Sequence, residues 1–465
     1  MEKYTVGIIG GGPGGYTAAI RLQQYGIDTV VFEKERIGGV CLNWGCIPTK
    51  ALVKVSDLYD ELHHVEQFGL SIENPTYDYS KIFKRKNQVV EKLVSGLEFL
   101  FKKRQIPVIN EQVISLEKGE NSYLIRTGNE SYETHYVIIA TGSQPKELPS
   151  CRIDGEHILS SKDVLKIESL PDRLIVVGGG VIGCEFASIF SQLGVEVHIV
   201  EFLPQLVSTE DSEISKRLAM VFKKKGIKLH LNTGLEKWKY ENNEIKVILS
   251  TGVELTTDRI LLSVGRKPNF DITCNNFELY KEKEAIAIDG IMETNQHNLF
   301  AIGDVTGKML LAHTASKQGL FAAEVIQQRI KGSKASPDTI LYENIPRCTF
   351  TNPEIGSVGL SEVQAKERFG DILVGRFPFT ANGKALGLGV TIGFVKTIAD
   401  AMTKTIVGMH ILGPQATELI AEGGIIVQSG MTIDEALKVV YAHPTLSEAV
   451  AESIEDLEKM SIHSM

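Results

Sequence analysis

The sequence predicts an α/β protein with two Rossmann-like nucleotide-binding domains, and three observations lead to this prediction. A glycine-rich turn between an apolar strand and a helix occurs twice along the chain. In both copies the next strand ends at an acidic residue. The length of 465 residues is enough for about three or four domains, so further structure accompanies the two repeats.

The first repeat carries a GxGxxG turn at Gly10, Gly12 and Gly15, and its acidic residue is Glu33, which follows Gly10 by 23 residues. Such glycines let the backbone approach a pyrophosphate at a helix N-terminus, and the acid accepts a hydrogen bond from a ribose hydroxyl. The expected elements are a strand at residues 5–9, a helix through Tyr25 and a strand from Thr29 to Phe32.

The second repeat has its turn at Gly178, Gly180 and Gly183, and Glu201 again follows the first glycine by 23 residues. One GxGxxG is often merely a turn, but two full repeats with matched acids are strong evidence for two nucleotide sites. Residues 202–207 contain no basic side chain. A 2′-phosphate would need an arginine there, so this site favours NAD over NADP. The expected elements are a strand at 174–177, a helix to about Leu193 and a strand at 195–200.

Cys41 and Cys46 follow the first repeat closely, where a cysteine pair can pass electrons between a bound cofactor and an external thiol or disulfide. A helical spacing of five separates the Cα atoms too far for an easy disulfide. We therefore expect Cys41 before the first full turn, with Gly45 and Pro48 bending the backbone, and a lowered pKa for a cysteine at the helix start. A zinc site needs four ligands and no second pair lies nearby, so no metal is expected.

Bulk properties narrow the function classes. The net charge of −9 argues against nucleic-acid binding, and no apolar run reaches the length of about 18 residues that a membrane span needs. The N-terminus leads directly into a strand without a signal peptide. Six cysteines in this length do not indicate an extracellular disulfide scaffold, so we expect a cytoplasmic protein. The Lys-rich, amphipathic residues 80–105 are interpreted as a solvated helical face.

Eight motifs along nearly the whole chain resemble those of the FAD-dependent pyridine-nucleotide disulfide oxidoreductases, and most closely the members that oxidise dihydrolipoamide. The motifs are Gly-Gly-Pro-Gly-Gly-Tyr (11–16), Cys-Leu-Asn-x-Gly-Cys-Ile-Pro (41–48), Ala-Thr-Gly-Ser (140–143), Gly-Gly-Gly-Val-Ile-Gly-Cys-Glu (178–185), Val-Gly-Arg-Lys-Pro-Asn (264–269), Ile-Gly-Asp (302–304), Leu-Ala-His (311–313) and His-Pro-Thr-Leu-Ser-Glu (443–448).

The resemblance implies three parts: an FAD-binding domain at 1–145 that returns at 273–342, an NAD-binding domain at 146–272, and a C-terminal α+β dimerisation domain at 343–465. It places Lys50 near the flavin N5, paired with Glu185. The FAD-binding residues that it implies are Gly10, Gly12, Gly15, Glu33, Lys50, Thr141, Gly142, Ser143, Asp304, Leu310, Leu311, Ala312 and His313. The NAD-binding residues that it implies are Gly178, Gly180, Gly183, Glu185, Glu201 and Gly265.

His443 is the candidate base, although a lone histidine is usually a surface or satisfied core residue. Pro444 stiffens the segment, and if a helix begins after it, Glu448 can reach back, orient the imidazole and raise its basicity. By the resemblance, His443 takes a proton from dihydrolipoamide and serves the cysteines of a partner subunit. A homodimer is then a functional requirement. Cys41 is the outer sulfur of the redox pair and Cys46 the flavin-side sulfur.

Three alternatives stay in view. A glutathione-type reductase would prefer NADPH, contrary to Glu201, and a mercuric-ion reductase has a further cysteine pair near its C-terminus, whereas no cysteine follows Cys348. Another NAD-linked flavin disulfide reductase remains open. Val40, Trp44 and Thr49 depart from the family pattern beside the cysteines, which bears on the flavin potential or substrate access but removes no reacting atom. The acidic residues 452–458 are interpreted as an exposed helical face, with docking on a basic module of a 2-oxo-acid dehydrogenase complex as the alternative.

Overall fold

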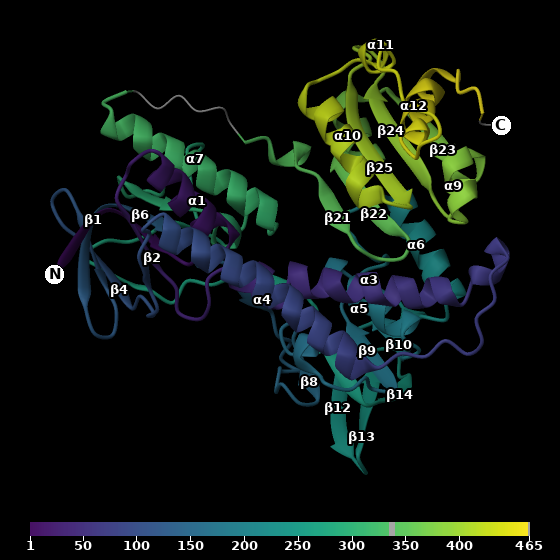
Figure 1. The fold of residues 1–465 in the computed structure, drawn as a ribbon, viewed down its shortest axis with the longest axis horizontal. Coiled ribbons are helices and arrows are strands. Elements are labelled where there is room, and N and C mark those ends of the chain that lie inside the picture. Colours follow the sequence, from purple (N-terminus) through teal and green to yellow (C-terminus); the bar gives the residue numbers. More distant parts are fainter. Residues whose placement is uncertain (334–339, 464–465) are drawn as a thin grey trace. The chain divides into compact units, whose positions relative to one another are not determined.

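The computed structural model describes residues 1–333 and 340–463. Its chain divides into two compact units, drawn as a ribbon in Figure 1. Unit 1 comprises Met1–Ala51, Phe83–Lys146 and Gly265–Tyr342, and unit 2 comprises Leu52–Ile82, Glu147–Val264 and Glu343–Met465. Within the described ranges, no helix combines the length and apolar character that crossing a membrane requires.

Unit 1 is built on an eight-stranded sheet in the order β17-β4-β5-β6-β1-β2-β3, with β20 also pairing with β6. The central strands β6, β1, β2 and β3 run parallel, as in a nucleotide-binding sheet, while β4 and β5 form an antiparallel extension. The strands are β1 (Glu2–Ile9), β2 (Thr29–Phe32), β3 (Val108–Ile109), β4 (Ser115–Lys118), β5 (Tyr123–Arg126), β6 (Ser131–Ile139), β17 (Thr273–Asn275) and β20 (Leu299–Ala301). Two short pairs, β7 (Ser143–Pro145) with β16 (Arg266–Pro268) and β18 (Lys281–Glu282) with β19 (Ala285–Ile286), complete this unit.

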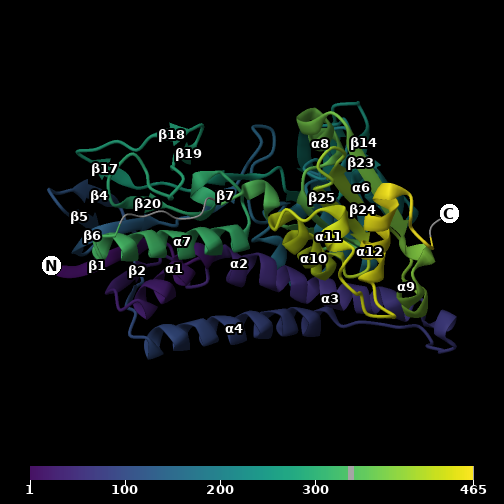
Figure 2. The ribbon, with the colours of Figure 1, turned by 90° about the horizontal axis from the view of Figure 1, so that it is seen from above.

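Helices α1 (Pro13–Gln24) and α7 (Ala312–Ile330) lie side by side in unit 1, as Figure 2 shows. The approach is close because Gly319 of α7 meets the backbone of Gly14, where a side chain would not fit. Apolar residues of both helices join β1 and β6 in one core, including Ile8, Leu22 and Ala322. This packing brings the start of α7 beside the first glycine turn.

Helices α3 (Cys46–Leu62) and α4 (Tyr79–Lys103) each contain residues of both units. The expected helix at 80–105 is thus present, but its interpretation as a uniformly solvated basic face is wrong for Lys86. That side chain is buried, and its Nζ lies 4.1 Å from the centroid of the Phe83 ring. Burial lowers the pKa of Lys86 to about 8, because the charged form loses hydration.

Unit 2 contains a second parallel sheet in the order β11-β10-β9-β15-β8. Its strands are β8 (Ile158–Leu159), β9 (Arg173–Val177), β10 (Glu196–Val200), β11 (Lys228–His230) and β15 (Arg259–Leu262), accompanied by α5 (Val181–Gln192) and α6 (Ser212–Lys224). An antiparallel sheet of β12 (Leu235–Glu241), β13 (Glu244–Leu249) and β14 (Glu254–Thr257) is inserted before β15.

The C-terminal part of unit 2 is an antiparallel sheet in the order β21-β22-β25-β24-β23, and Figure 1 shows α10 beside β22 and β25. Its strands are β21 (Arg347–Thr349), β22 (Glu354–Gly359), β23 (Ile372–Pro378), β24 (Phe394–Asp400) and β25 (Ile406–Gly413). Its helices are α8 (Glu362–Phe369), α9 (Gly383–Leu388), α10 (Ala416–Gln428), α11 (Ile433–Ala436) and α12 (Glu448–Glu455). Two parallel nucleotide-type sheets plus this α+β part confirm the predicted fold class.

Candidate active site

The two glycine turns have the same backbone geometry. Gly10 and Gly178 have φ angles of 109° and 106°, and a side chain at either would run into the carbonyl of Ala140 or Ser263 respectively. Only glycine tolerates both the left-handed angle and this approach. Gly12 and Gly180 then occupy the N-caps of α1 and α5.

Each acidic residue hydrogen-bonds its own glycine turn, a contact that the spacing did not predict. The N–H of Gly11 donates to Oε2 of Glu33 at 2.8 Å, and the N–H of Gly179 donates to Oε2 of Glu201 at 2.5 Å. A second backbone N–H, from Glu35 or Leu203, donates to the other oxygen of each carboxylate. A carboxylate offers about four acceptor positions, so both retain capacity for a ribose hydroxyl.

The cysteine pair lies at a break between two helices. Cys41 belongs to the short helix α2 (Gly39–Trp44), and Cys46 is the first residue of α3. Gly45 makes the break with φ −142° and ψ −112°, and a Cβ there would lie 2.9 Å from the Val40 carbonyl oxygen. The prediction that Gly45 bends the chain is confirmed. Pro48 instead lies inside the first turn of α3, where its missing N–H costs no helical hydrogen bond.

Both redox cysteines are half-buried and reduced in the structure. The pKa of Cys41 is raised, first by its hydrogen bond with Cys46 and then by burial, although Lys50 opposes the shift. A lowered pKa was expected for a cysteine at a helix start; for Cys46, the first residue of α3, this stays a prediction, whereas the pKa of Cys41 is not lowered. The reason is that two adjacent sulfurs share one proton, and a second negative charge beside the first is disfavoured.

The helix with Cys41 is anchored directly on the first glycine turn. The N–H of Gly38 donates to the Gly11 carbonyl at 2.8 Å. Gly39, with φ 58°, lies so close to Gly12 that a Cβ would fall 2.7 Å from the Gly12 Cα. Sequence reasoning missed these two glycines, although the Gly38-Gly39 pair before the cysteines was the available signal. The contact sets the redox pair next to the turn that is expected to receive a pyrophosphate.

Asp304 is held in a polar chain with Ser143 and Arg266. The Ser143 hydroxyl donates to Oδ2 of Asp304 at 2.5 Å and accepts from Nε of Arg266 at 2.7 Å. The same guanidinium donates to the Ser143 carbonyl at 2.6 Å. Burial raises the pKa of Asp304, which Ser143 and Arg266 oppose, and burial lowers the pKa of Arg266. The sequence assigned no role to Arg266. In the structure it fixes the position of Ser143 and, through Ser143, of Asp304, both of which are predicted FAD contacts.

Two orphaned hydroxyls fit the expectation that FAD binds in unit 1. Thr141 Oγ1 and Thr314 Oγ1 are buried and have no hydrogen-bond partner within the described structure. Thr141 follows β6, and Thr314 is in the first turn of α7, directly after the predicted contacts Leu310–His313. A buried polar atom without a partner is costly, and a ligand with phosphate and ribityl oxygens would supply partners. The residues present therefore fit FAD.

Three further predicted residues occupy defined places. Lys50 lies one turn after Cys46 on α3, and Glu185 on α5 accepts the Phe350 N–H at Oε1, at 3.0 Å. Gly265 precedes β16 with φ 107°. The pairing of Lys50 with Glu185 stays a prediction.

His443 and Glu448 form a close pair in unit 2. Nδ1 of His443 lies 2.7 Å from Oε1 of Glu448, and Oε2 accepts the Thr445 N–H at 2.8 Å. Helix α12 begins at Glu448, as the argument for reaching back required. Burial acts to raise the pKa of Glu448, but the bonds from Thr445 and His443 outweigh it and the pKa is lowered. The carboxylate can therefore stabilise a protonated imidazole, whose ring is 78% exposed.

The acidic residues 452–458 do not form the exposed face that we expected. Glu452 is buried, and Asp456 accepts the Arg376 N–H at 2.8 Å. Glu458 is the exposed acid of the group and pairs with Lys404 at 3.3 Å. Ile454 and Leu457 are both buried, and their spacing of three residues places one face of this stretch against the core. These acidic side chains therefore form hydrogen bonds and ion pairs within the C-terminal part of unit 2.

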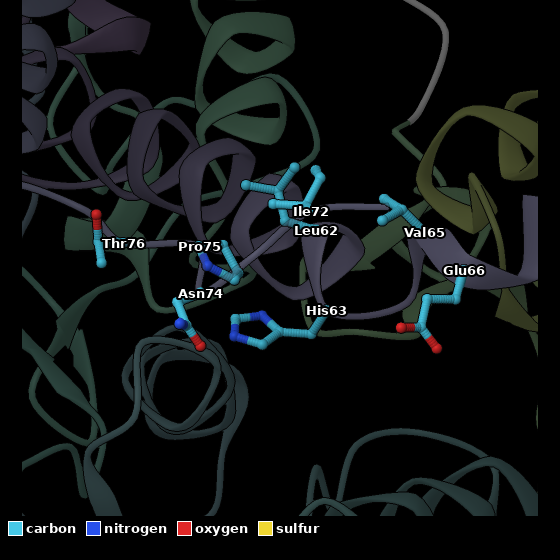
Figure 3. Close-up of a pocket in the computed structure, with 8 residues that line it drawn as sticks. All are labelled: Leu62, His63, Val65, Glu66, Ile72, Asn74, Pro75 and Thr76. Carbon is cyan, nitrogen blue, oxygen red and sulfur yellow. The ribbon is translucent and has the colours of Figure 1, made fainter. Parts of the chain in front are cut away.

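Figure 3 shows a surface pocket of about 400 Å³ at the end of α3 and the loop that follows it. Its lining residues are Leu62, His63, Val65, Glu66, Ile72, Asn74, Pro75 and Thr76. None of the predicted site residues lines it. The chemistry therefore concentrates elsewhere, at the glycine turns, the cysteine pair and the His443–Glu448 pair.

The chain is similar over nearly its full length to characterised enzymes. It is 37% identical to a dihydrolipoyl dehydrogenase of Zymomonas mobilis, with 97% of both chains covered, and 37% identical to one of Bacillus subtilis, with 99% of both covered. Among solved structures, LpdA of Mycobacterium tuberculosis matches with a TM-score of 0.87 at 25% identity, covering 98% of this chain and 100% of that one. The HOCl-induced flavoprotein disulfide reductase RclA of Escherichia coli matches with 0.83 at 26%, covering 97% and 99%.

Family models cover both parts of the chain. The model described as pyridine nucleotide-disulphide oxidoreductase matches residues 4–319, and its dimerisation-domain counterpart matches residues 345–454. The expected FAD and NAD cofactors and the oxidoreductase class agree with these matches. The resemblance seen in the motifs is confirmed, and the chain belongs to the pyridine nucleotide-disulphide oxidoreductase family.

Proposed function

We propose that this protein is a dihydrolipoyl dehydrogenase, which oxidises dihydrolipoamide to lipoamide and reduces NAD⁺. The observation that carries the proposal is the cysteine pair itself. Cys41 and Cys46 meet at the Gly45 break, and the Gly38 N–H, which donates to the Gly11 carbonyl at 2.8 Å, ties the helix of Cys41 to the first glycine turn. The relatives named dihydrolipoyl dehydrogenase support the choice of substrate.

The chain's own residues carry the thiol chemistry. His443 takes a proton from one substrate thiol, and the thiolate attacks the oxidised pair at Cys41, so that the Cys41–Cys46 bond breaks and Cys46 leaves as a thiolate. The second substrate thiol attacks the mixed disulfide at the substrate sulfur, closes the lipoamide ring and releases Cys41, which receives that thiol's proton. The sum is one substrate disulfide formed and one enzyme disulfide reduced.

Other residues bind and stabilise. Bound FAD supplies the path by which the electron pair leaves the cysteines and reaches NAD⁺ as a hydride. Residues 1–145 and 273–342 form the proposed FAD-binding domain, and residues 146–272 form the proposed NAD-binding domain. Lys50, one turn after Cys46, helps to stabilise negative charge beside the flavin-side sulfur. Glu448 holds the imidazole of His443 in the tautomer whose Nε2 is free to accept a proton.

The proposed assembly is a cytoplasmic homodimer, with residues 343–465 as the interface domain and His443 serving the partner's cysteines. The match of residues 345–454 to a dimerisation domain supports the homodimer. A lipoyl domain, together with the acyltransferase component of a 2-oxo-acid dehydrogenase complex, is the proposed partner.

A second candidate is an NAD-linked flavin disulfide reductase with another substrate, which the similarity to RclA favours. Steady-state rates separate the two: dihydrolipoamide with NAD⁺, against NADH with glutathione disulfide or coenzyme A disulfide. We expect turnover with the lipoyl pair and little with the others. Faster turnover of another disulfide would overturn the substrate assignment.

The redox pair is tested separately by Cys46→Ser, with Cys274→Ser as the matched control because Cys274 is also a half-buried free thiol of unit 1. We expect Cys46→Ser to abolish lipoyl turnover and to remove the long-wavelength absorbance band that appears when NADH delivers two electrons. The control should keep both. Lipoyl turnover that survives in Cys46→Ser would disprove the mechanism.

A further inference from the structure

A second histidine–carboxylate pair lies on the same helix as the candidate base. Nδ1 of His463 contacts Oε1 of Glu452, and Glu452 lies one turn after Glu448 on α12. Residues four apart on a helix share one face. The helix therefore presents two carboxylates side by side, one paired with His443 and the other with His463.

Glu452 holds the C-terminal segment 461–463 through several bonds. Oε2 of Glu452 accepts the Ser461 hydroxyl at 2.5 Å, the Ile462 N–H at 3.0 Å and the His463 N–H at 3.3 Å. The Glu452 side chain is largely buried, at 11% exposure. Burial acts to raise its pKa, but the bonds from Ser461 and His463 lower it, so this carboxylate is charged and needs a nearby cation.

We propose, on the basis of the proposed function, that His463 is a positioning residue for the catalytic base. It clamps the C-terminal segment on α12 through Glu452 and, when protonated, acts on Glu448, the carboxylate that pairs with His443. The segment is then part of the machinery that sets how readily His443 takes a proton from the substrate.

The charge balance around α12 supports this role. Among the described residues, the charged groups that act on His463 are Glu452 first, and then Glu448 and Glu455, all on α12; together they raise the pKa of His463. The pKa of Glu455 is raised by burial and by Glu452, and His463 opposes the shift. Three carboxylates within two turns repel one another, and protonation of His463 relieves this repulsion.

The sign of the effect on the base follows from Coulomb's law. A cation near His443 disfavours the second positive charge of a protonated His443. Removing it should move the acid limb of kcat/KM for dihydrolipoamide upward by ~0.3 pH unit, or about twofold in rate on that limb, the size expected when solvent weakens the repulsion between two unit charges that do not touch. A merely structural loss would instead loosen Glu448 and lower kcat, or move the limb downward.

The test compares His463→Gln, which can still hydrogen-bond but carries no charge, with His463→Lys, which restores a cation. The matched control is His297→Gln, because His297 is similarly exposed (73% against 68%) and pairs with Glu293 at 3.4 Å in unit 1. We expect the upward shift in His463→Gln, wild-type profiles in His463→Lys and His297→Gln, and disappearance of the difference in 1 M salt, where charges are screened within about 3 Å.

Selective ¹⁵N-histidine NMR titration of His443 in the full-length holoenzyme gives a readout that does not depend on the substrate. If lipoyl turnover is absent but the His443 titration shifts upward in His463→Gln, the substrate assignment fails while the positioning role stands. The role is refuted if neither measurement shifts, if the shift is downward, or if His297→Gln produces the same change.

Discussion

Replacing Glu448 by Gln is the sharpest test of the candidate base. The change keeps the size of the side chain and can keep the Thr445 N–H bond at 2.8 Å, but it removes the negative charge 2.7 Å from Nδ1 of His443. A hydrogen bond to a charged group contributes about 1.5–3 kcal/mol. Since about 1.4 kcal/mol is a factor of ten in rate, kcat/KM for dihydrolipoamide should fall by roughly 10- to 150-fold.

The pH profile gives the same variant a second readout. Without the carboxylate, the imidazolium form of His443 is less stable, so the acid limb of kcat/KM should move to lower pH while the plateau falls. Reduction of ferricyanide by NADH does not need His443 and should stay within about twofold of wild type. The assay is stopped-flow and steady-state turnover from pH 5.5 to 9.

Glu458→Gln is the matched control, because Glu458 lies in the same part of the chain but pairs with exposed Lys404 at 3.3 Å. An exposed pair of this kind contributes ~0–1 kcal/mol to stability, and its loss should leave turnover unchanged. The assignment of His443 as base would be refuted by a plateau in Glu448→Gln that stays within twofold of wild type, or by an equal loss in the control.

Three further predictions concern binding and stability. Gly178→Ala should raise the KM for NAD⁺ at least tenfold while flavin absorbance is retained, because the new Cβ meets the Ser263 carbonyl; Gly194→Ala, with nothing within 4 Å of its Cβ, should leave KM unchanged. Asp211→Asn should cost about 1.5–3 kcal/mol in urea unfolding, the range for a hydrogen bond to a charged group, because it removes the negative charge that accepts from Lys396 at 2.8 Å, where both side chains are 1% exposed. Glu213 and Glu362 still compensate the charge of Lys396 in the variant. A loss below ~0.5 kcal/mol, the scale of surface changes, would contradict this. Glu293→Gln should destabilise the protein at pH 7, and the difference from wild type should shrink as pH falls below about 4.5. Burial acts to raise the pKa of Glu293, but the bonds from Arg329 lower it, so the stabilisation is present above the unfolded pKa and is lost as pH falls through the folded pKa. A difference that does not shrink between about pH 4.5 and about pH 3 would count against it.

Local pattern predicted the nucleotide-binding elements closely. The strand expected from Thr29 to Phe32 agrees with β2. The two helices end at Gln24 and Gln192, and the predicted last residues, Tyr25 and Leu193, are their C-caps. These elements depend on the periodicity of apolar residues and on glycines at turn positions that need a positive φ angle. Such information is contained in a short stretch of chain.

Local sequence pattern could not predict contacts between residues that lie far apart along the chain. Lys86 looks solvated in a Lys-rich helix, but its burial depends on what packs against α4. Glu452 looks like one of several surface acids, yet a segment about ten residues later folds back on it. Arg266 meets Ser143 across 123 residues. In each case the partner, rather than the local pattern, decides the role of the charge.

The two nucleotide-binding repeats differ in the segment of chain that binds to each glycine turn, and this difference bears on which repeat serves the thiol chemistry. In each turn, the carbonyl of the residue after the first glycine accepts a backbone N–H from the segment that follows the acidic residue. Gly11 accepts from Gly38, and Gly179 accepts from Val207, both at 2.8 Å. After the first anchor the chain enters α2 with Cys41, whereas after the second it reaches Asp211, which caps α6 and binds Lys396. The same scaffold thus supports a redox pair in one repeat and a buried ion pair in the other. This difference supports the proposal that the first repeat serves the reduction of the disulfide and that the second binds the nicotinamide nucleotide.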